Sequence, residues 1–217
     1  MAIQAGKKLI KIDVTSDTVC PWCFVGKKYL EKAMDASKDQ YNFEVRWHPY
    51  LLNPNAPKEG MEKREFYKRR LGEASVEPII VRMTKMFDDL GYKFKFGGLI
   101  GNTLDSHRLI EFAGHQGADK QNALVEELFL SYFTQEKYIG DLEVLVEAAE
   151  KVGISGGVRE FLEDPNAGLN EIQEQLKKYG LGVTGVPHFL IQDQYKLSGA
   201  QPPDSLLQVF QLAASHA

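Results

Sequence analysis

Both cysteines of this 217-residue sequence lie in one short stretch, SDTVCPWCFVG, in which two residues separate Cys20 from Cys23. Two thiols at this spacing can cycle between a dithiol and a disulfide, and a thiolate can attack the disulfide of another molecule. The same spacing occurs in half of a zinc site and in structural disulfides. The stretch therefore leaves three kinds of chemistry open.

Composition weighs against two of them. A structural zinc site takes four ligands, commonly as two close pairs, whereas this sequence has only two cysteines and no two histidines separated by three to five residues. A structural disulfide that closes so short a loop would add little stability. We therefore expect a working dithiol and no metal site.

The elements around the cysteines favour the same interpretation. Alternating apolar and polar residues predict a strand at 8–14 and another at 43–49. Between them, Pro21 suits the first turn of a helix, where its missing N–H is not needed, and the helix should end near Asp35. The first fifty residues thus predict a strand–helix–strand unit, the beginning of an α/β sheet.

In this unit the two thiols are not equivalent. Cys20 lies at the N-terminus of the helix, where free backbone N–H groups and the positive end of the helix dipole stabilise a thiolate. Cys23 lies one turn further in, and it can attack a mixed disulfide formed at Cys20. We expect Cys20 to be the reactive thiol and Cys23 to be shielded.

A proline near the C-terminus marks the return of strand structure. The stretch GVTGVPHFLIQ places Val186–Pro187 directly before a strand, and a proline there should take the first position because it cannot donate to the ladder. Such a bond can be cis. A cis bond beside the dithiol would leave the Val186 backbone free to pair with an extended substrate, whereas the alternative is an ordinary strand-initiating proline.

The middle of the chain is helical in pattern. After the loop LLNPNAPKEG, helices are expected at about 60–71, 75–90, 103–116, 119–136, 141–152 and 157–163, with Asn102 and Asp141 as N-caps. A helix at about 168–179, a hairpin and a terminal helix from Asp204 follow. We expect an α/β domain, 1–53 and 168–217, split by a helical insertion domain, 54–167.

Charge and hydropathy limit the partners. Lys+Arg 26 against Asp+Glu 30 gives a formal charge of −4, so no global field attracts nucleic acid. The basic run KREFYKRRLGE is interpreted as a solvated helix face. The N-terminus lacks a signal-like apolar region, and no run has the length of a membrane span. We expect a cytoplasmic protein with no membrane or nucleic-acid partner; in the cytosol a permanent structural disulfide is rare.

The order of these features resembles the thioredoxin superfamily in its DsbA arrangement, and more narrowly the FrnE-type family. The motifs DTVCPWCFVGKKYLEKA, WHPYLLNPNAPKEG, GNTLDSHRLIEFAGHQG, LFLSYFTQEKYIGDLEVLVEAAEKVG and GVTGVPHFLI carry the resemblance over nearly the whole chain. It implies a thioredoxin-like fold with an inserted all-helical domain and thiol–disulfide oxidoreductase activity. It also implies Cys20 as nucleophile, Cys23 as resolving cysteine and Val186–Pro187 as the cis-proline element.

Glutathione transferase kappa and 2-hydroxychromene-2-carboxylate isomerase belong to the same branch, but they usually carry serine where Cys20 stands. The glutathione-binding Asp-Arg pair that these proteins carry near the last helix is not matched either, because this chain has Asp204-Ser205 there. A glutathione-dependent transferase or isomerase of small aromatic substrates stays open as an alternative, as does a non-redox accessory binding protein. No cofactor is expected, although glutathione remains a candidate thiol co-substrate beside protein or low-molecular-weight disulfides.

Further residues are candidates for substrate binding. Pro21 and Trp22 lie between the cysteines, and Trp22 is expected to be an exposed platform for an apolar peptide. The resemblance places Asn102 and His107 at the start of a helix facing the dithiol; a helix cap and a packing histidine are the alternatives.

Two histidines and two carboxylates complete the set. His48 and His188 are interpreted as structural residues of strands. Asp13 and Asp17 are candidates to take the proton of Cys23, although a polar turn also explains Asp17.

Overall fold

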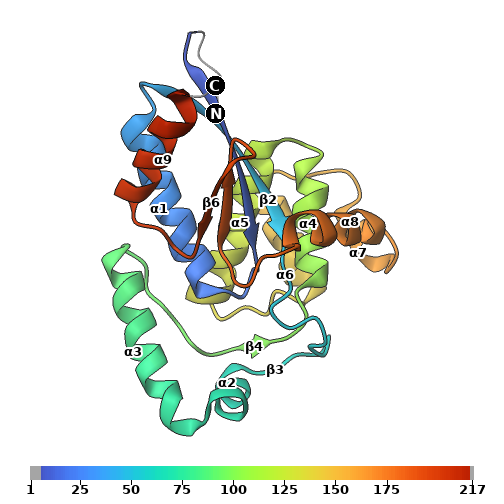
Figure 1. Cartoon of the computed structure of the whole chain (residues 1–217). Helices are drawn as coiled ribbons and strands as arrows, with labels where there is room; N and C mark the ends of the chain where they lie inside the picture. The colour runs from blue at the N-terminus through green and yellow to red at the C-terminus, as the bar shows by residue number, and fades with distance from the viewer. Residues whose placement is uncertain (1–5, 216–217) are drawn as a thin grey trace.

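The centre of the computed structural model, which describes residues 6–215, is a four-stranded sheet in the order β2–β1–β5–β6 (Figure 1). β1 pairs with β2 in parallel over nine residues, and β5 pairs antiparallel with both β1 and β6. The bounds are β1 (Lys8–Ser16), β2 (Tyr41–Pro49), β5 (His188–Ile191) and β6 (Tyr195–Ser198). The predicted α/β architecture is therefore confirmed.

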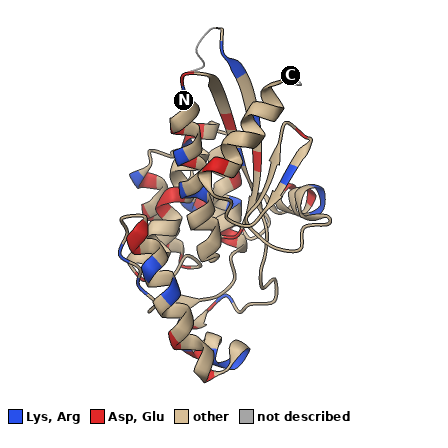
Figure 2. Cartoon of the chain, turned by 60° about the vertical axis from the view of Figure 1, so that its left-hand side comes forward, with Lys and Arg blue, Asp and Glu red and all other residues tan. Residues whose placement is uncertain are grey.

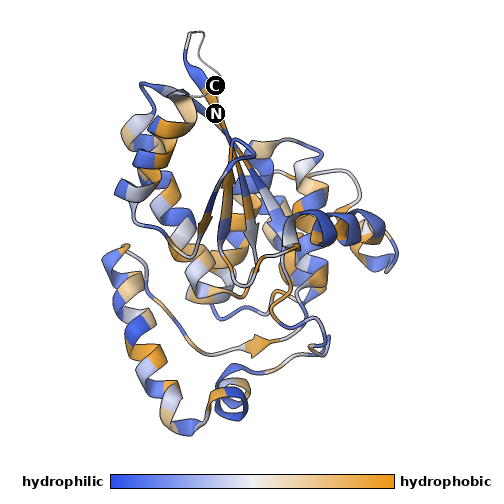
Figure 3. Cartoon of the chain, in the orientation of Figure 1, coloured by the Kyte–Doolittle hydropathy of each residue, from blue (hydrophilic) through white to orange (hydrophobic). Residues whose placement is uncertain are grey.

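Helices cover both faces of this sheet. On one face α1 (Pro21–Ser37) packs against α9 (Pro203–Ser215), which also contacts β1. On the other face α5 (Ala118–Thr134), α4 (Leu104–Gly114) and α8 (Leu169–Gly180) contact β2. The strands of the centre mix hydrophobic and hydrophilic residues (Figure 3), and the hydrophobic residues Ile10, Ile12 and Val14 of β1 are almost fully buried. The core therefore runs through the sheet into both helical layers.

The segment expected as the insertion is mainly helical, as predicted. In addition to α4 and α5 it contains α2 (Lys63–Leu71), α3 (Glu73–Asp89), α6 (Leu142–Lys151) and α7 (Val158–Glu163). It also contains a short antiparallel pair, β3 (Met61–Glu62) with β4 (Leu99–Ile100), so the segment is not all-helical. Strands of two residues are too short to leave an alternating pattern in the sequence.

α2 and α3 form an arm, residues 63–89, that extends from the body and passes the N-terminal end of α1 (Figure 1). Its surface carries many charged residues of both signs (Figure 2). An aromatic cluster fills the space between α1 and the arm, and the Phe24 ring stacks on Phe87 with centroids 4.7 Å apart. The arm is thus attached to the body on the side where α1 begins.

Candidate dithiol site

The loop between β1 and α1 holds Cys20 at the start of the helix. Cys20 is the N-cap residue and Pro21 the first helical one. The Cys20 N–H donates to the Asp17 carbonyl at 3.0 Å, and the Cys20 carbonyl accepts from the Cys23 N–H at 3.0 Å. Both cysteines are free thiols, and their exposed fractions are 5% for Cys20 and 0% for Cys23. Cys23 is therefore shielded, as the sequence predicts.

Burial is the main reason why the pKa of Cys23 lies well above its ordinary value. The hydrogen bond to the Cys20 side chain and the negative charge of a Cys20 thiolate raise this pKa further. Hydrogen bonds from the Ser16 hydroxyl and the Asp17 backbone act in the opposite direction with smaller effect. Cys23 is thus held as a protonated thiol inside the helix, whereas Cys20 lies at the N-terminus of the helix.

The start of β5 lies beside the dithiol. The Cys20 Sγ donates to the Val186 carbonyl at 3.6 Å, and the Val186–Pro187 peptide bond is cis, as expected. The Pro187 ring packs directly on α1, because a Cβ added to Gly26 would lie 2.8 Å from the Pro187 Cγ. Glycine at position 26 therefore allows these two segments to meet.

A buried carboxylate anchors the dithiol loop from behind. Asp17 is fully buried, and its Oδ2 accepts from the Leu52 N–H at 2.7 Å. The His107 Nε2 lies 3.6 Å from the Asp17 Oδ1 and 3.1 Å from the Tyr50 carbonyl oxygen. His107 is itself 3% exposed. The structure thus places His107 against the loop and the Asp17 carboxylate, and its predicted contact with substrate stays a prediction.

Asn102 fastens the same region at a second point. Its Oδ1 accepts from the Leu104 N–H at 2.8 Å, so its side chain caps the first turn of α4, although the N-cap position itself is Thr103. Its Nδ2 donates to the Ala56 carbonyl at 3.2 Å. Asn102 therefore joins α4 to the loop after β2. Its predicted role in substrate binding stays a prediction.

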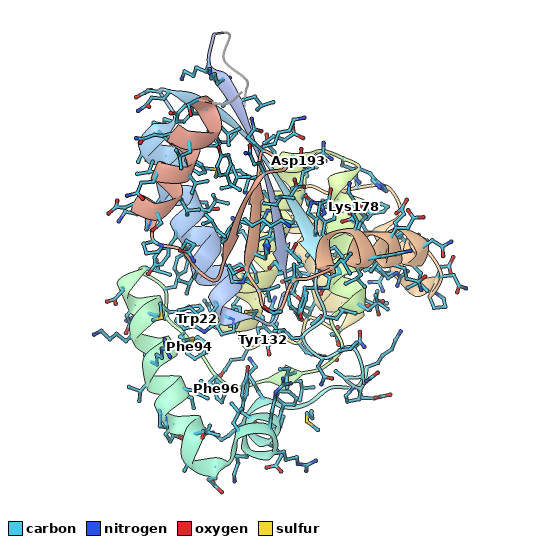
Figure 4. All side chains as sticks on the ribbon, viewed as in Figure 1. Trp22, Phe94, Phe96, Tyr132, Lys178 and Asp193 are labelled. Carbon is cyan, nitrogen blue, oxygen red and sulfur yellow. The ribbon has the colours of Figure 1, made fainter. Side chains whose placement is uncertain are left out.

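Trp22 is half-buried, so its expected exposure is wrong, and its predicted role as a platform for an apolar peptide stays a prediction. The Arg82 guanidinium of α3 lies 4.9 Å from the centre of the Trp22 ring. Figure 4 shows Trp22 with Phe94 and Phe96 in the space between the start of α1 and the arm. The sequence could not indicate this, because α3 is distant along the chain and reaches Trp22 only through the fold.

A cavity of about 550 Å³ opens next to the dithiol turn. The two chain neighbours of Cys20, Val19 and Pro21, form part of its wall. The loop after β2 and α2 supply most of the remainder, including Leu52, Ala56, Phe66, Tyr67 and Arg70. This wall was not predicted from the sequence; the adjacent aromatic residues inside the basic run were the available signal.

The run KREFYKRRLGE is therefore not simply a solvated face. Lys63 is 3% exposed, with its Nζ 3.7 Å from the centre of the Tyr132 ring, and desolvation lowers its pKa to about 8. Burial raises the pKa of Tyr67 to about 12, and the nearby Cys20 charge adds to this. Only part of the run, including the ion-paired Arg64 and Lys68, fits the solvated interpretation.

The other polar candidates have structural contacts. The His48 ring is buried, stacks on Tyr179 and lies with its Nε2 2.6 Å from Asp13 Oδ1. Asp13 is therefore engaged by a histidine of the sheet rather than by Cys23. His188, half-buried in β5, has a pKa lowered first by burial and then by the charge of Lys196. The contacts of His48 agree with the structural role expected for it, whereas the structural role expected for His188 stays a prediction.

Comparison with known proteins identifies the class. The model of the DSBA-like thioredoxin domain matches residues 11–211, so the chain belongs to this family and has its thioredoxin-like fold. Family members are oxidoreductases or isomerases.

Three individual proteins illustrate the likeness. The uncharacterized protein YwbO of Bacillus subtilis (strain 168) is 29% identical over 191 residues, which are 85% of this chain and 88% of YwbO. The crystal structure of the probable DsbA oxidoreductase SCO1869 from Streptomyces coelicolor has a TM-score of 0.87 at 27% identity, covering 96% of this chain and 91% of that one.

The third is the cytosolic disulfide reductase DsbM from Pseudomonas aeruginosa with GSH. It has a TM-score of 0.67 at 13% identity and covers 94% of this chain and 99% of its own. At this identity it supports the fold alone.

In the part of the chain that the structure describes, no helix combines the length and hydropathy needed to cross a membrane.

Proposed function

We propose that the protein is a thiol–disulfide oxidoreductase whose reacting groups are the sulfurs of Cys20 and Cys23. The observation that carries this proposal is the arrangement of three groups: Cys20 at the helix N-terminus, Cys23 buried one turn below, and the Val186 carbonyl 3.6 Å from the Cys20 Sγ. A structural disulfide would need no such backbone acceptor beside its outer sulfur.

The geometry supports a two-step exchange. A Cys20 thiolate at the N-terminus of the helix attacks one sulfur of a substrate disulfide and releases the other as a thiolate. The negative charge of Cys20, one cause of the raised pKa of Cys23, disappears in the mixed disulfide. Cys23 can then give up its proton to the departing thiolate and attack the Cys20 sulfur, which leaves a Cys20–Cys23 disulfide. Two electrons pass from the dithiol to the substrate.

Several finer assignments belong to the same proposal. We assign the chain to the FrnE-type group on its sequence motifs, and we propose the cytoplasm as its compartment because no cysteine lies outside the dithiol. Protein disulfides or low-molecular-weight disulfides are the proposed substrates, and glutathione is the proposed reductant. The likeness in fold to DsbM, a disulfide reductase whose structure is known with GSH, supports glutathione only by analogy.

Trapping the mixed disulfide tests the proposal. The reduced Cys23→Ser variant should form a covalent adduct with an insulin-derived or glutathione disulfide, visible by mass spectrometry, because Cys23 no longer resolves it. Cys20→Ser should give no adduct and no turnover.

The alternatives give different outcomes in the same assays. A glutathione-dependent isomerase or transferase would bind glutathione non-covalently, and its activity on a small organic substrate would survive Cys23→Ser. An accessory binding protein would show no disulfide turnover that depends on Cys20. Either result would remove the oxidoreductase proposal.

A further inference from the structure

The cavity beside the dithiol turn has mainly apolar walls. Its side chains are mainly apolar or aromatic, among them Leu52, Met61, Phe66 and Ile100. Its volume of about 550 Å³ lies in the usual range of small-molecule sites, roughly 300–1,000 Å³. It therefore has room for a compact apolar group rather than only for the side of an extended backbone.

The cavity and the reactive sulfur are adjacent. Val19 and Pro21, on either side of Cys20 in the chain, line the cavity. Tyr67, from the opposite wall, lies close enough for its pKa to respond to the charge of Cys20. Cys20 is only 5% exposed, and its two chain neighbours place it at the edge of this cavity.

Within residues 6–215, one cation of the cavity wall, Arg70, forms no ion pair with a carboxylate. On α2, Arg69 pairs with Glu65 at 2.8 Å, Lys68 pairs with Glu73 at 2.8 Å, and Arg64 pairs with Glu77. Arg70 lines the cavity and lies 5.8 Å from the centre of the Phe66 ring, and within residues 6–215 no carboxylate forms an ion pair with it. A guanidinium above an aromatic wall suits an anionic group on a flat apolar body.

The Asp17 carboxylate at the inner wall is held by hydrogen bonds of its own. Both of its oxygens already accept hydrogen bonds, from the Leu52 N–H and more weakly from the Val19 N–H, and His107 lies behind it. Asp17 is fully buried, and its charge adds to the raised pKa of Tyr67, so its negative charge acts at the Tyr67 side of the cavity wall.

From these observations we propose that the cavity selects low-molecular-weight disulfides whose body is apolar or aromatic and carries a carboxylate, with Arg70 as the residue that recognises the carboxylate. This inference rests on the proposed oxidoreductase function and names its substrate class. The Cys20 thiolate attacks the sulfur attached to the bound group R, which forms Cys20–S–S–R and releases the other half as a thiolate. Cys23 then attacks the Cys20 sulfur and displaces R–S⁻, which takes up the Cys23 proton. The protein is left with a Cys20–Cys23 disulfide.

Single-turnover kinetics with pre-reduced protein test this selection, because the dithiol itself supplies both electrons. Two probes are aromatic: 5,5′-dithiobis(2-nitrobenzoate) is anionic, and 4,4′-dithiodipyridine is neutral. Two probes are not aromatic: bis(2-hydroxyethyl) disulfide is small and neutral, and glutathione disulfide is anionic and polar. Each rate is divided by the rate of N-acetylcysteine with the same probe, to remove intrinsic reactivity. We expect the nitrobenzoate to have the highest normalised rate.

Two variants separate charge from shape. Arg70→Gln should slow the nitrobenzoate about tenfold, the effect of roughly 1.4 kcal/mol, and leave dithiodipyridine within about twofold. Arg64→Gln removes the same charge from the same helix at a residue paired with Glu77, so it should change neither rate. Ala56→Leu, which fills the cavity, should slow both aromatic probes and spare bis(2-hydroxyethyl) disulfide.

The failures are distinguishable. If reduced protein reacts with none of the four probes faster than N-acetylcysteine and does not reduce insulin, the oxidoreductase function itself is wrong. If all probes have similar normalised rates, or glutathione disulfide has the highest, the function stands and the proposed substrate class is wrong. Equal effects of Arg70→Gln and Arg64→Gln would show that any positive charge on α2 has the same influence on the rate. That result would also overturn the inference.

Discussion

α1 and α3 are both seventeen residues long; α1 begins with the dithiol turn and α3 passes close to that end, but the two helices are held very differently. Nine residues of α1 are buried, whereas α3 buries only Val76, Met83 and Phe87. Segments with few buried contacts open at lower free energy than the core. The comparison indicates a division of work: the body fixes the sulfurs, whereas the less firmly held arm contributes α2 to the wall of the cavity beside them.

The largest expected effect breaks the packing of the body. Phe24 is fully buried and stacks on Phe87, so Phe24→Ala should lower the free energy of unfolding by about 3–5 kcal/mol. The matched change on the arm is Val81→Ala, because Val81 is 67% exposed; it should stay within about 0.5 kcal/mol of wild type. Urea denaturation of the two variants measures the difference, and equal losses would contradict the division.

The next effect concerns the only buried residue of α2, Lys63. Its pKa is about 8 in the folded chain against an ordinary 10.5, because burial disfavours the charged form and the charges of Glu136 and Glu62 only partly offset this. Between these two pH values the unfolded chain binds more protons than the folded one, so the free energy of unfolding rises with pH. Below pH 8 both states are protonated and the cost of the buried charge is fully present.

The variant Lys63→Met removes this titration while keeping an unbranched apolar stem. The difference in unfolding free energy, wild type minus variant, should increase between pH 8 and 10.5 by at most about 3 kcal/mol. Denaturation curves of both proteins across this range provide the measurement, and titrations that the two share cancel. A difference independent of pH would show that Lys63 is not desolvated.

A third test addresses the contact between α1 and β5. A methyl group at Gly26 would meet the Pro187 ring at 2.8 Å, so Gly26→Ala should cost about 1–3 kcal/mol through overpacking. It should also slow insulin reduction, because the Val186 carbonyl moves with this contact. The control is Gly180→Ala at the end of α8, where a Cβ has no neighbour within 4 Å. Similar stability of both variants would argue against close packing at residue 26.

The smallest expected effect lies where the two regions touch. Arg82→Gln removes the guanidinium that lies 4.9 Å from the Trp22 ring centre, and it should cost about 0.5–1 kcal/mol. A double-mutant cycle with Trp22→Leu isolates this contact from the other effects of each change. A coupling energy near zero would mean that the arm is held against α1 by the aromatic cluster alone.

The sequence predicts best what is local. The strand–helix boundary at Pro21, the shielded Cys23 and the cis bond before β5 follow from residues within a few positions of one another. The burial of Trp22 could not be predicted, because Arg82 reaches it across sixty residues of chain. Lys63 and Phe66 were misjudged for a similar reason: a short basic helix has no apolar period that would indicate which of its sides faces a cavity.

The hydrogen bond from the Cys20 Sγ to the Val186 carbonyl also has a consequence for biosynthesis, because it joins residues 166 positions apart. At about 5–20 residues per second, the ribosome needs roughly 10–30 s to make the intervening chain. During that interval the CPWC turn exists without β5, so its thiols lack the neighbours that shield them in the finished molecule. While the chain is incomplete, this dithiol is therefore more open to oxidation, or to coupling with a cysteine of another chain, than it is in the finished molecule.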